Sequence, residues 1–366
     1  MSMSDLVRPC VKGLTPYVPG KPIEEVRREF GLTGEIVKLA SNENPLGPSP
    51  TAVEAMRAAA ADVHFYPDND CFELRQKLSQ HLGMPGEQVL FGHGSDELIH
   101  NVGLAFISPG DEVMMCAGPF SQYEFTAKLM GATVVQVPLA DWAYNLKAMA
   151  RALTGRTKVV FIGSPNNPTG TIVRTGELAD FMKALPATAL LVMDEAYYAY
   201  VDDPDYPDSL ALVREGRNVI VLRTFSKIYA LAGLRMGYGV TTPGLAAAMD
   251  AVREPFNVSS LAQAAAVASL SDAGQVTRTK RLNEEAKQQF YRGFDQLGLP
   301  YTRSHANFVW VDVGRDCRGV FVELLKRGVI VRTGDIYGAP QHLRVSTGTV
   351  EQNGRFLAAL GEVLAA

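Results

Sequence analysis

The segment TFSK, residues 224–227, places Lys227 just after two hydroxyl residues, Thr224 and Ser226. Arg235 follows eight positions after the lysine, beyond the mostly apolar stretch IYALAGL. A solvated helix would carry several charges along a polar face, and this segment does not. The hydroxyls and the guanidinium suit a phosphate, and the single amine suits a carbonyl group that it attacks.

Further polar and aromatic side chains follow other predicted strands. Ligands of open α/β sheets bind at the carboxyl ends of the strands, so these positions are candidates for one site. A glycine turn that opens a helix, GHGSDEL, is receptive to phosphate because backbone N–H groups and the positive helix end face the ligand. The residues at the strand ends are Ser95 and Asp96 in that turn, Phe120, Asn166 and Asn167 in the turn PNNPTG, and Asp194 with Tyr197.

Each of these features has a simpler explanation when it is taken alone. Asn and Pro favour turns whatever their function, a strand-terminal aspartate is commonly a cap, and a lone lysine is usually solvated. Five such groups at five strand ends of one sheet are harder to explain in that way. Together they specify a ligand with a phosphate, a flat aromatic ring with an oxygen anion, a ring nitrogen that needs a carboxylate, and an aldehyde. Pyridoxal 5′-phosphate has all of these groups.

The elements that must position these residues alternate between helices and short apolar strands from about residue 50 to residue 224. This alternation predicts an α/β fold with a large, mainly parallel sheet that helices cover on both faces. After Pro255 a long helical stretch, 261–298, leads into strands that predict a second, smaller α/β lobe. The predicted parts are an N-terminal arm at 1–44 that packs with the small lobe or a partner subunit, a large cofactor-binding domain at 45–254, and a small C-terminal domain at 255–366.

The composition is that of an ordinary soluble globular protein. Hydrophobic residues make up 47% of the 366 residues and charged residues 20%, with a formal net charge of −4. This balance argues against a nucleic-acid or anionic membrane surface as partner. Four dispersed cysteines and six histidines show no metal-ligand spacing, so we expect no metal. The amino terminus has no apolar segment typical of secretion signals, which predicts a cytoplasmic protein.

From about residue 14 to the carboxyl terminus, the chain resembles the fold-type I pyridoxal-phosphate-dependent aminotransferases of class II. Within that class it is most similar to the histidinol-phosphate aminotransferase family, including the segment LTPY and two late arginines. The resemblance implies a two-lobed subunit in a homodimer with shared active sites. The motifs that carry it are NENP (42–45), YPD (66–68), GSDE (94–97), SPNNPTG (164–170), DEAY (194–197), TFSKIYALAGLRMGY (224–238) and HLRVSTGT (342–349).

The resemblance also implies a role for each residue that matches a family motif. Lys227 would bind the cofactor as a Schiff base and carry protons, with Asp194 at the ring nitrogen and Tyr197 and Asn167 at the ring oxygen. Phe120 takes the stacking position, where many relatives have Tyr. The phosphate would be held by Ser95, Asp96, Thr224, Ser226, Arg235 and, from the partner subunit, Tyr66. The substrate would be held by Tyr17, Asn44, Arg332 and Arg344.

The implied reaction is a ping-pong transfer of the amino group of histidinol phosphate to 2-oxoglutarate, which gives imidazole acetol phosphate and glutamate in histidine biosynthesis. An aromatic amino-acid aminotransferase is the main alternative, because Arg344 alone suffices for a carboxylate. A pyridoxal-phosphate-dependent decarboxylase acting on a phosphorylated amino acid would share the site. A non-catalytic effector-binding domain is disfavoured, because only about 44 residues precede the first large-lobe helix.

Overall fold

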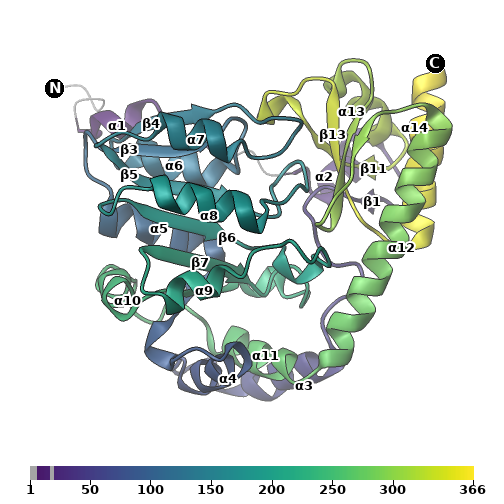
Figure 1. The fold of residues 1–366 in the computed structure, drawn as a ribbon. Helices are drawn as coiled ribbons and strands as arrows, with labels where there is room; N and C mark the ends of the chain where they lie inside the picture. The colour runs from purple at the N-terminus through teal and green to yellow at the C-terminus, as the bar shows by residue number, and fades with distance from the viewer. Residues whose placement is uncertain (1–5, 17–19) are drawn as a thin grey trace.

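The computed structural model describes residues 6–16 and 20–366. Two main β-sheets of this described part lie side by side (Figure 1). The large sheet has seven strands in the order β2-β8-β7-β6-β5-β3-β4. In that order they are β2 (Val89–His93), β8 (Met236–Val240), β7 (Val219–Thr224), β6 (Leu190–Asp194), β5 (Thr157–Gly163), β3 (Glu112–Cys116) and β4 (Thr133–Val137).

Neighbouring strands of the large sheet run parallel, except where β8 pairs antiparallel with β2 and β7. A mainly parallel sheet is covered on both faces, so its strands have continuous apolar sequences rather than alternating ones. The sequence LLVM of β6 is such a run, and each of its residues is buried. The predicted α/β fold with a large, mainly parallel sheet is therefore confirmed.

Helices cover both faces of the large sheet because successive strand residues point to opposite sides. Leu191 and Met193 of β6 belong to the core on one face, whereas Leu190 and Val192 belong to the core on the other. The first face packs against α7 (Leu146–Ala152), α8 (Thr175–Ala184) and α9 (Ser209–Arg214). The second packs against α5 (Gly94–Phe106), α6 (Ser121–Leu129) and α10 (Pro243–Asp250).

The small sheet is antiparallel and has the strand order β12-β13-β10-β9. Its core includes Phe290, Phe294 and Phe356, which are fully buried and contact one another. These side chains come from the helices that pack on the sheet. The elements are β9 (Tyr301–Thr302), β10 (Phe308–Asp312), β12 (Arg332–Thr333), β13 (His342–Ser346), α12 (Ala273–Leu297), α13 (Cys317–Lys326) and α14 (Val350–Ala365).

The amino-terminal segment runs along the small sheet before it enters the large part. Its strand β1 (Val37–Lys38) pairs in parallel with β11 (Val329–Ile330), and α2 (Ile23–Phe30) buries Val26 beside the same strand. A short helix, α1 (Pro9–Lys12), contacts α6 instead. The domain boundaries at residues 44 and 254 stay predictions.

A third group of helices lies at the lower end of the view in Figure 1. It consists of α3 (Pro50–Ala59), α4 (Phe72–Leu82) and α11 (Ser260–Leu270), and α11 packs against both of the others. The 25-residue helix α12 runs from this group up to the small sheet. The remaining elements are 3₁₀ turns at η2 (Ala60–Asp62), η3 (Gly86–Gln88), η4 (Tyr198–Tyr200), η5 (Ala232–Leu234) and η6 (Asp335–Tyr337).

Two local features differ from the sequence expectation. The stretch expected as one long helix is divided into α11 and α12, because Asp272 caps the second helix by accepting the N–H of Gln275. Strand β8 was not expected, since glycines weaken strand propensity and its sequence is MGYGV. Gly237 is required there: a Cβ atom would lie 2.4 Å from the backbone nitrogen of Ser95.

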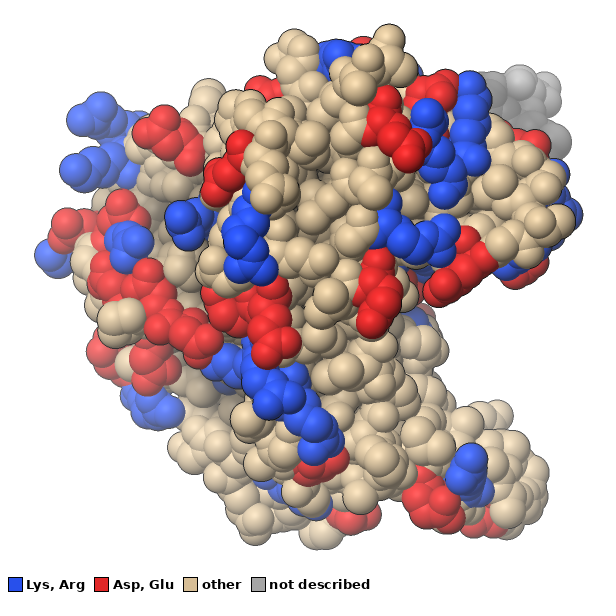
Figure 2. Space-filling model, turned by 90° about the vertical axis from the view of Figure 1, so that its right-hand side faces the viewer, with Lys and Arg blue, Asp and Glu red and all other residues tan. Residues whose placement is uncertain are grey.

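Among the described residues, no helix is both long and apolar enough to cross a membrane. On the face shown in Figure 2, lysine and arginine side chains alternate with aspartate and glutamate. This face therefore shows no extended field of one sign, in agreement with the modest net charge of −4.

Candidate active site

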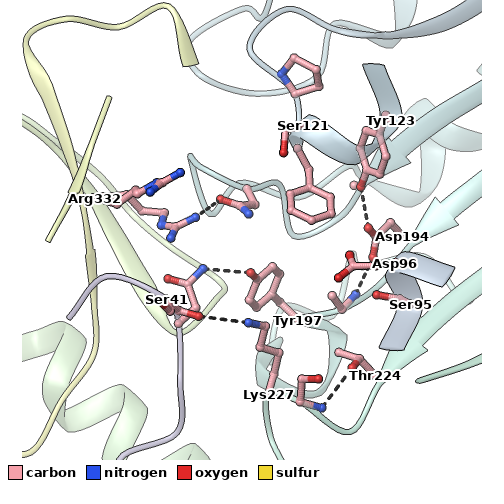
Figure 3. Close-up of a pocket in the computed structure, with 18 of the residues that line it drawn as sticks. Ser41, Ser95, Asp96, Ser121, Tyr123, Asp194, Tyr197, Thr224, Lys227 and Arg332 are labelled. Carbon is pink, nitrogen blue, oxygen red and sulfur yellow. Dashed lines mark hydrogen bonds between the residues drawn. The ribbon is translucent and has the colours of Figure 1, made fainter. Parts of the chain in front are cut away.

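A cavity of about 470 Å³ lies where the strand ends of the large sheet face the small sheet. Its walls come from the turns after β2, β3, β5, β6 and β7 on one side and from β12 and β13 on the other. Figure 3 shows Asp194 and Arg332 on opposite sides of this space. The cavity brings together these predicted site residues: Ser95, Asp96, Phe120, Asn167, Asp194, Tyr197, Thr224, Ser226, Lys227, Arg235, Arg332 and Arg344.

The amine of Lys227 points into the cavity, where its Nζ donates to the backbone oxygen of Ser41 at 3.2 Å (Figure 3). Burial lowers the pKa of Lys227 from 10.5 to about 8, and the positive charge of Arg344 acts in the same direction. The carboxylate of Asp96 opposes these effects. Near neutral pH a buried amine with this pKa is neutral far more often than an exposed lysine, and a nucleophile or a base needs the neutral form.

The carboxylate of Asp194 lies at the end of β6 and has a donor on each oxygen. Its Oδ2 accepts the hydroxyl of Tyr123 at 2.6 Å, and its Oδ1 accepts the N–H of Ala196 at 3.1 Å. Burial raises the pKa of Asp194 from 3.8 to about 6, and these two hydrogen bonds act against that rise. The side chain is therefore held as an anion above about pH 6 with its direction fixed.

The end of the cavity near α5 is suited to a small anion. The first turn of α5 presents Ser95 and Asp96, at the helix end where backbone N–H groups lack partners within the helix. Arg235 donates to the hydroxyl of Ser226 at 3.3 Å and to Asp96 at 3.1 Å. The hydroxyl of Thr224 accepts the N–H of Ser226 and thereby fixes the turn that leads to the lysine.

Close packing at Gly94 places Arg235 in this anion-binding end. Gly94 has φ +74°, and a Cβ atom there would lie 2.4 Å from Nη2 of Arg235. Only glycine adopts this conformation easily and leaves room for the guanidinium. Gly94 thus determines both the backbone conformation of this turn and the position of the Arg235 side chain.

Between these ends, Tyr197 and Asn167 approach the cavity from neighbouring turns. The hydroxyl of Tyr197 accepts a hydrogen bond from the side-chain amide of Asn42 at 2.9 Å. Its ring packs edge-on against Phe308 of the small sheet. Asn167 accepts a hydrogen bond from Arg344 through its side-chain oxygen. Its amide nitrogen is left as a donor for a bound molecule.

Arg344 and Arg332 form the wall that the small sheet contributes. They are direct partners across the antiparallel pair β12–β13, so both side chains lie on the same face of the sheet. Arg344 donates to the backbone oxygen of Ala40 at 2.6 Å and to the hydroxyl of Tyr337 at 3.0 Å. Its Nε is buried and has no hydrogen-bond partner among the described residues. Two adjacent cations on one face favour binding of an anion between them.

The sequence model of the aminotransferase class I and II family matches residues 34–360. The chain belongs to this aminotransferase family. A histidinol-phosphate aminotransferase of Moorella thermoacetica is 51% identical over 98% of this chain and 93% of its own length. Another, of Caldicellulosiruptor saccharolyticus, is 44% identical over 98% of this chain and 100% of its own length.

A solved structure of histidinol-phosphate aminotransferase from Sinorhizobium meliloti in complex with pyridoxal-5′-phosphate is similar over the whole fold. Its TM-score is 0.91 at 31% identity, and the match covers 98% of this chain and 97% of that one. The expected fold type and family are confirmed by these similarities.

Two of the predicted site residues are not part of this cavity. Asn44 is buried elsewhere, where its amide donates to the backbone oxygen of Ile228 and the hydroxyl of Thr279. Tyr66 is 83% exposed and stacks on Phe256, outside this chain's cavity. Tyr17 lies outside the described residues.

Several lining residues of this aminotransferase were not predicted from the sequence. The sequence analysis chose Asn44, the second asparagine of the motif NENP, as a site residue. In the structure the first asparagine, Asn42, contacts Tyr197, and the chain turns at Asn42 with φ of +55°. Tyr123 follows Phe120 by three residues, a helical spacing that places both on one side of α6. That spacing was the available signal. Ser41 contacts Lys227 from a segment 186 positions away, which no local sequence pattern predicts. Tyr337 contacts Arg344, seven positions further along the chain, through a turn that the sequence did not single out.

Proposed function

We propose that the protein transfers the amino group of histidinol phosphate to 2-oxoglutarate, forming imidazole acetol phosphate and glutamate. The observation that carries this proposal is the pair Arg332 and Arg344, side by side on the cavity wall that faces Lys227 and Asp194. A phosphate dianion can accept donors from two guanidinium groups at once. The histidinol-phosphate aminotransferases that are 44–51% identical over nearly the whole chain support the same substrate.

The residues present fit pyridoxal phosphate as the cofactor. The cavity holds a buried carboxylate, a buried amine and an anion-binding helix end, which match the ring nitrogen, the aldehyde and the phosphate of that molecule. Bound in this way, it would supply an aldehyde that captures amines and a ring that accepts electron density from the substrate's reacting carbon. The solved relative from S. meliloti contains the same cofactor.

Each side chain then has a defined task. Lys227, with its lowered pKa, is the base that removes the proton next to the substrate's amine and returns it in the second half-reaction. Asp194 would hold the proton on the ring nitrogen through its anionic carboxylate. Tyr197 and Asn167 would bind the ring oxygen, and Phe120 would pack on the ring face. The phosphate would be held by Ser95, Asp96, Thr224, Ser226 and Arg235.

We also propose that the protein acts as a homodimer in the cytoplasm and that Tyr66 completes the site of the partner subunit. Tyr66 lies outside its own chain's cavity and is 83% exposed, which is unusual for an aromatic side chain without a partner surface. Phe65 and Phe72, close to it in the chain, are also more than half exposed. Burial of these rings between two subunits would remove this apolar surface from water.

The deciding experiment compares kcat/KM for histidinol phosphate, phenylalanine and tyrosine with 2-oxoglutarate as acceptor. We expect histidinol phosphate to be preferred by about a hundredfold, because two arginines bind a dianion more strongly than a carboxylate. A preference for phenylalanine or tyrosine would identify an aromatic amino-acid aminotransferase instead. The Lys227→Ala variant, which lacks the base, serves as the inactive control in each assay.

A further inference from the structure

Tyr123 connects α6 to the carboxylate of Asp194 at the base of the cavity. Its hydroxyl donates to Oδ2 of Asp194 at 2.6 Å (Figure 3). The other carboxylate oxygen accepts the N–H of Ala196. Asp194 is therefore fixed by one donor from its own turn and one from a helix that begins beside Phe120.

The ring of Tyr123 cannot turn away from this position. It is 2% exposed and stacks on Phe161 with 4.7 Å between ring centroids and an interplanar angle of 3°. Phe120 packs edge-on against it at 5.7 Å. Gly163 lies next to the hydroxyl, since a Cβ atom there would come within 3.1 Å of it. Tight packing on each of these sides restricts the phenol to one direction.

The direction of the hydrogen bond is also fixed. Burial raises the pKa of Tyr123 well above 10, so the phenol keeps its proton and remains a donor at ordinary pH. Burial raises the pKa of Asp194 as well, and the hydrogen bond from Tyr123 is the largest effect that opposes this rise. The other titratable groups that act on the pair are Asp96 of α5, Glu195 of the next turn, Tyr144 before α7 and Cys116 of β3.

A carboxylate that faces a protonated pyridine nitrogen shares one proton with it. The proton stays on nitrogen only when the anionic carboxylate is stabilised more than the neutral acid, and a donated hydrogen bond does this. The N–H of Ala196 also donates to this carboxylate, but the hydrogen bond from Tyr123 has the larger effect on the pKa of Asp194. Without the phenol donor, the same proton would move from the ring nitrogen to Asp194.

We propose that Tyr123 is a positioning residue that acts through Asp194, holding its carboxylate as an anion so that the bound cofactor keeps the proton on its ring nitrogen. This inference rests on the proposed function, because it needs a bound pyridine ring. Its consequence is electronic: the ring accepts electrons only when its nitrogen carries the proton.

The test uses Tyr123→Phe, which removes the hydroxyl and retains the stacked ring. Protein freed of cofactor is titrated with pyridoxal phosphate, and the holoenzyme is prepared with cofactor labelled by ¹⁵N in the ring. We expect the dissociation constant to rise about tenfold to a hundredfold, as for loss of a hydrogen bond to a charged group. We expect the ¹⁵N resonance to move toward the value of an unprotonated pyridine.

The matched control is Tyr144→Phe. Tyr144 is also buried near the end of β5, and its hydroxyl accepts the N–H of Gly163. Among the hydrogen bonds of the described residues, those to the Asp194 carboxylate come from Tyr123 and Ala196 and not from Tyr144. Loss of that hydroxyl should leave the ¹⁵N resonance unchanged, because a general loss of packing does not relocate the proton. A shift of equal size in both variants would contradict the specific role of Tyr123.

Failure of this inference is distinguishable from failure of the proposed function. A parent protein that does not bind pyridoxal phosphate would overturn both. A parent that binds it with a protonated ring, together with a Tyr123→Phe variant of equal affinity and identical ¹⁵N resonance, would overturn the role of Tyr123 alone. An unprotonated ring in the parent at pH 8 would overturn it even if the variant does not fold.

Discussion

The guanidinium of Arg344 donates to the side-chain oxygen of Asn167, with 2.5 Å between Nη1 and Oδ1. Arg344 belongs to β13 of the small sheet, whereas Asn167 lies in the turn after β5 of the large sheet. The bond therefore joins the two parts of the molecule across the cavity. It also orients the amide of Asn167, since its oxygen is used and its nitrogen is left to donate. The residue proposed to bind the substrate and the residue proposed to bind the cofactor ring thus position each other.

Replacing Arg344 by Ala should lower kcat/KM for the preferred amino donor by at least about a hundredfold. The change removes a buried cation that binds the substrate anion and releases Asn167, a combined loss of about 3 kcal/mol or more. Steady-state kinetics, in which the concentration of the amino donor is varied, measure this fall in kcat/KM. The control is Arg318→Ala, which removes an exposed arginine of α13 that pairs with Asp335 outside the cavity. Parent-like kinetics of Arg344→Ala toward every donor would exclude the proposed clamp.

Gly94→Ala should weaken binding of pyridoxal phosphate by about tenfold or more, because the new methyl group would displace Arg235 from the anion-binding end. Gly110→Ala is a matched control. Gly110 also has a positive φ, +95°, but a Cβ atom there meets nothing within 4 Å. Both variants should lose about 1 kcal/mol of stability from backbone strain. Cofactor titration should separate them, and equal affinities would show that Arg235 does not bind the phosphate.

The lowered pKa of Lys227 predicts a pH effect on stability in protein freed of cofactor. Between about pH 8, the pKa of the folded state, and 10.5, the ordinary lysine value, the unfolded chain binds more protons than the folded one. The contribution of Lys227 to the free energy of unfolding therefore rises with pH across this window, and its penalty is fully present below pH 8. The Lys227→Met variant lacks this pH-dependent contribution to the free energy of unfolding.

Urea unfolding of both proteins from pH 7 to pH 10.5 measures the effect. The stability advantage of Lys227→Met over the parent should be largest near pH 7 and should shrink as the pH rises. Other groups also contribute to the pH dependence in this range, such as Cys116, whose pKa burial raises from 9.0 to about 11, but they are present in both proteins and cancel. A difference between the two proteins that does not change with pH would show that Lys227 is not desolvated.

The parts of the site that follow strands were predictable from the sequence, because the carboxyl ends of parallel strands meet at one edge. Asp194 ends β6, Lys227 follows the neighbouring strand β7, and both line the cavity as expected. The large sheet was predictable for the same reason: its buried strands are continuous apolar runs bounded by turn residues.

Contacts between distant segments were not predictable in this way. Ser41 reaches Lys227 across 186 positions of the chain, and Arg344 reaches Ala40 across 304. Such pairs depend on how the amino-terminal segment packs against the small sheet, which periodicity within one segment does not encode. Asn42 rather than Asn44 lines the cavity, and we attribute this to the positive φ of Asn42, which the motif alone does not reveal. A sequence motif indicates which residues are candidates for the site, but the backbone conformation determines which of them lines the cavity.

The buried ion pair between Glu195 and Arg223 should be essential for stability. Glu195 follows Asp194 and Arg223 precedes Thr224, so the pair connects the ends of β6 and β7 directly behind two residues of the cavity. The guanidinium lies 2.8 Å from the carboxylate and also packs over the ring of Tyr198. Glu195→Ala would leave a buried cation without its counter-ion, which costs about 3–5 kcal/mol.

Denaturant unfolding of the Glu195→Ala variant measures this loss. The control is Glu54→Ala, which breaks an exposed pair with Arg57 on α3 and should cost less than about 1 kcal/mol. Because Asp194 and Thr224 adjoin the buried pair, Glu195→Ala should also weaken cofactor binding, whereas Glu54→Ala should not. A Glu195→Ala protein as stable as the Glu54→Ala control would mean that water or a rearranged side chain neutralises Arg223, and the pair would then not hold the two strand ends together.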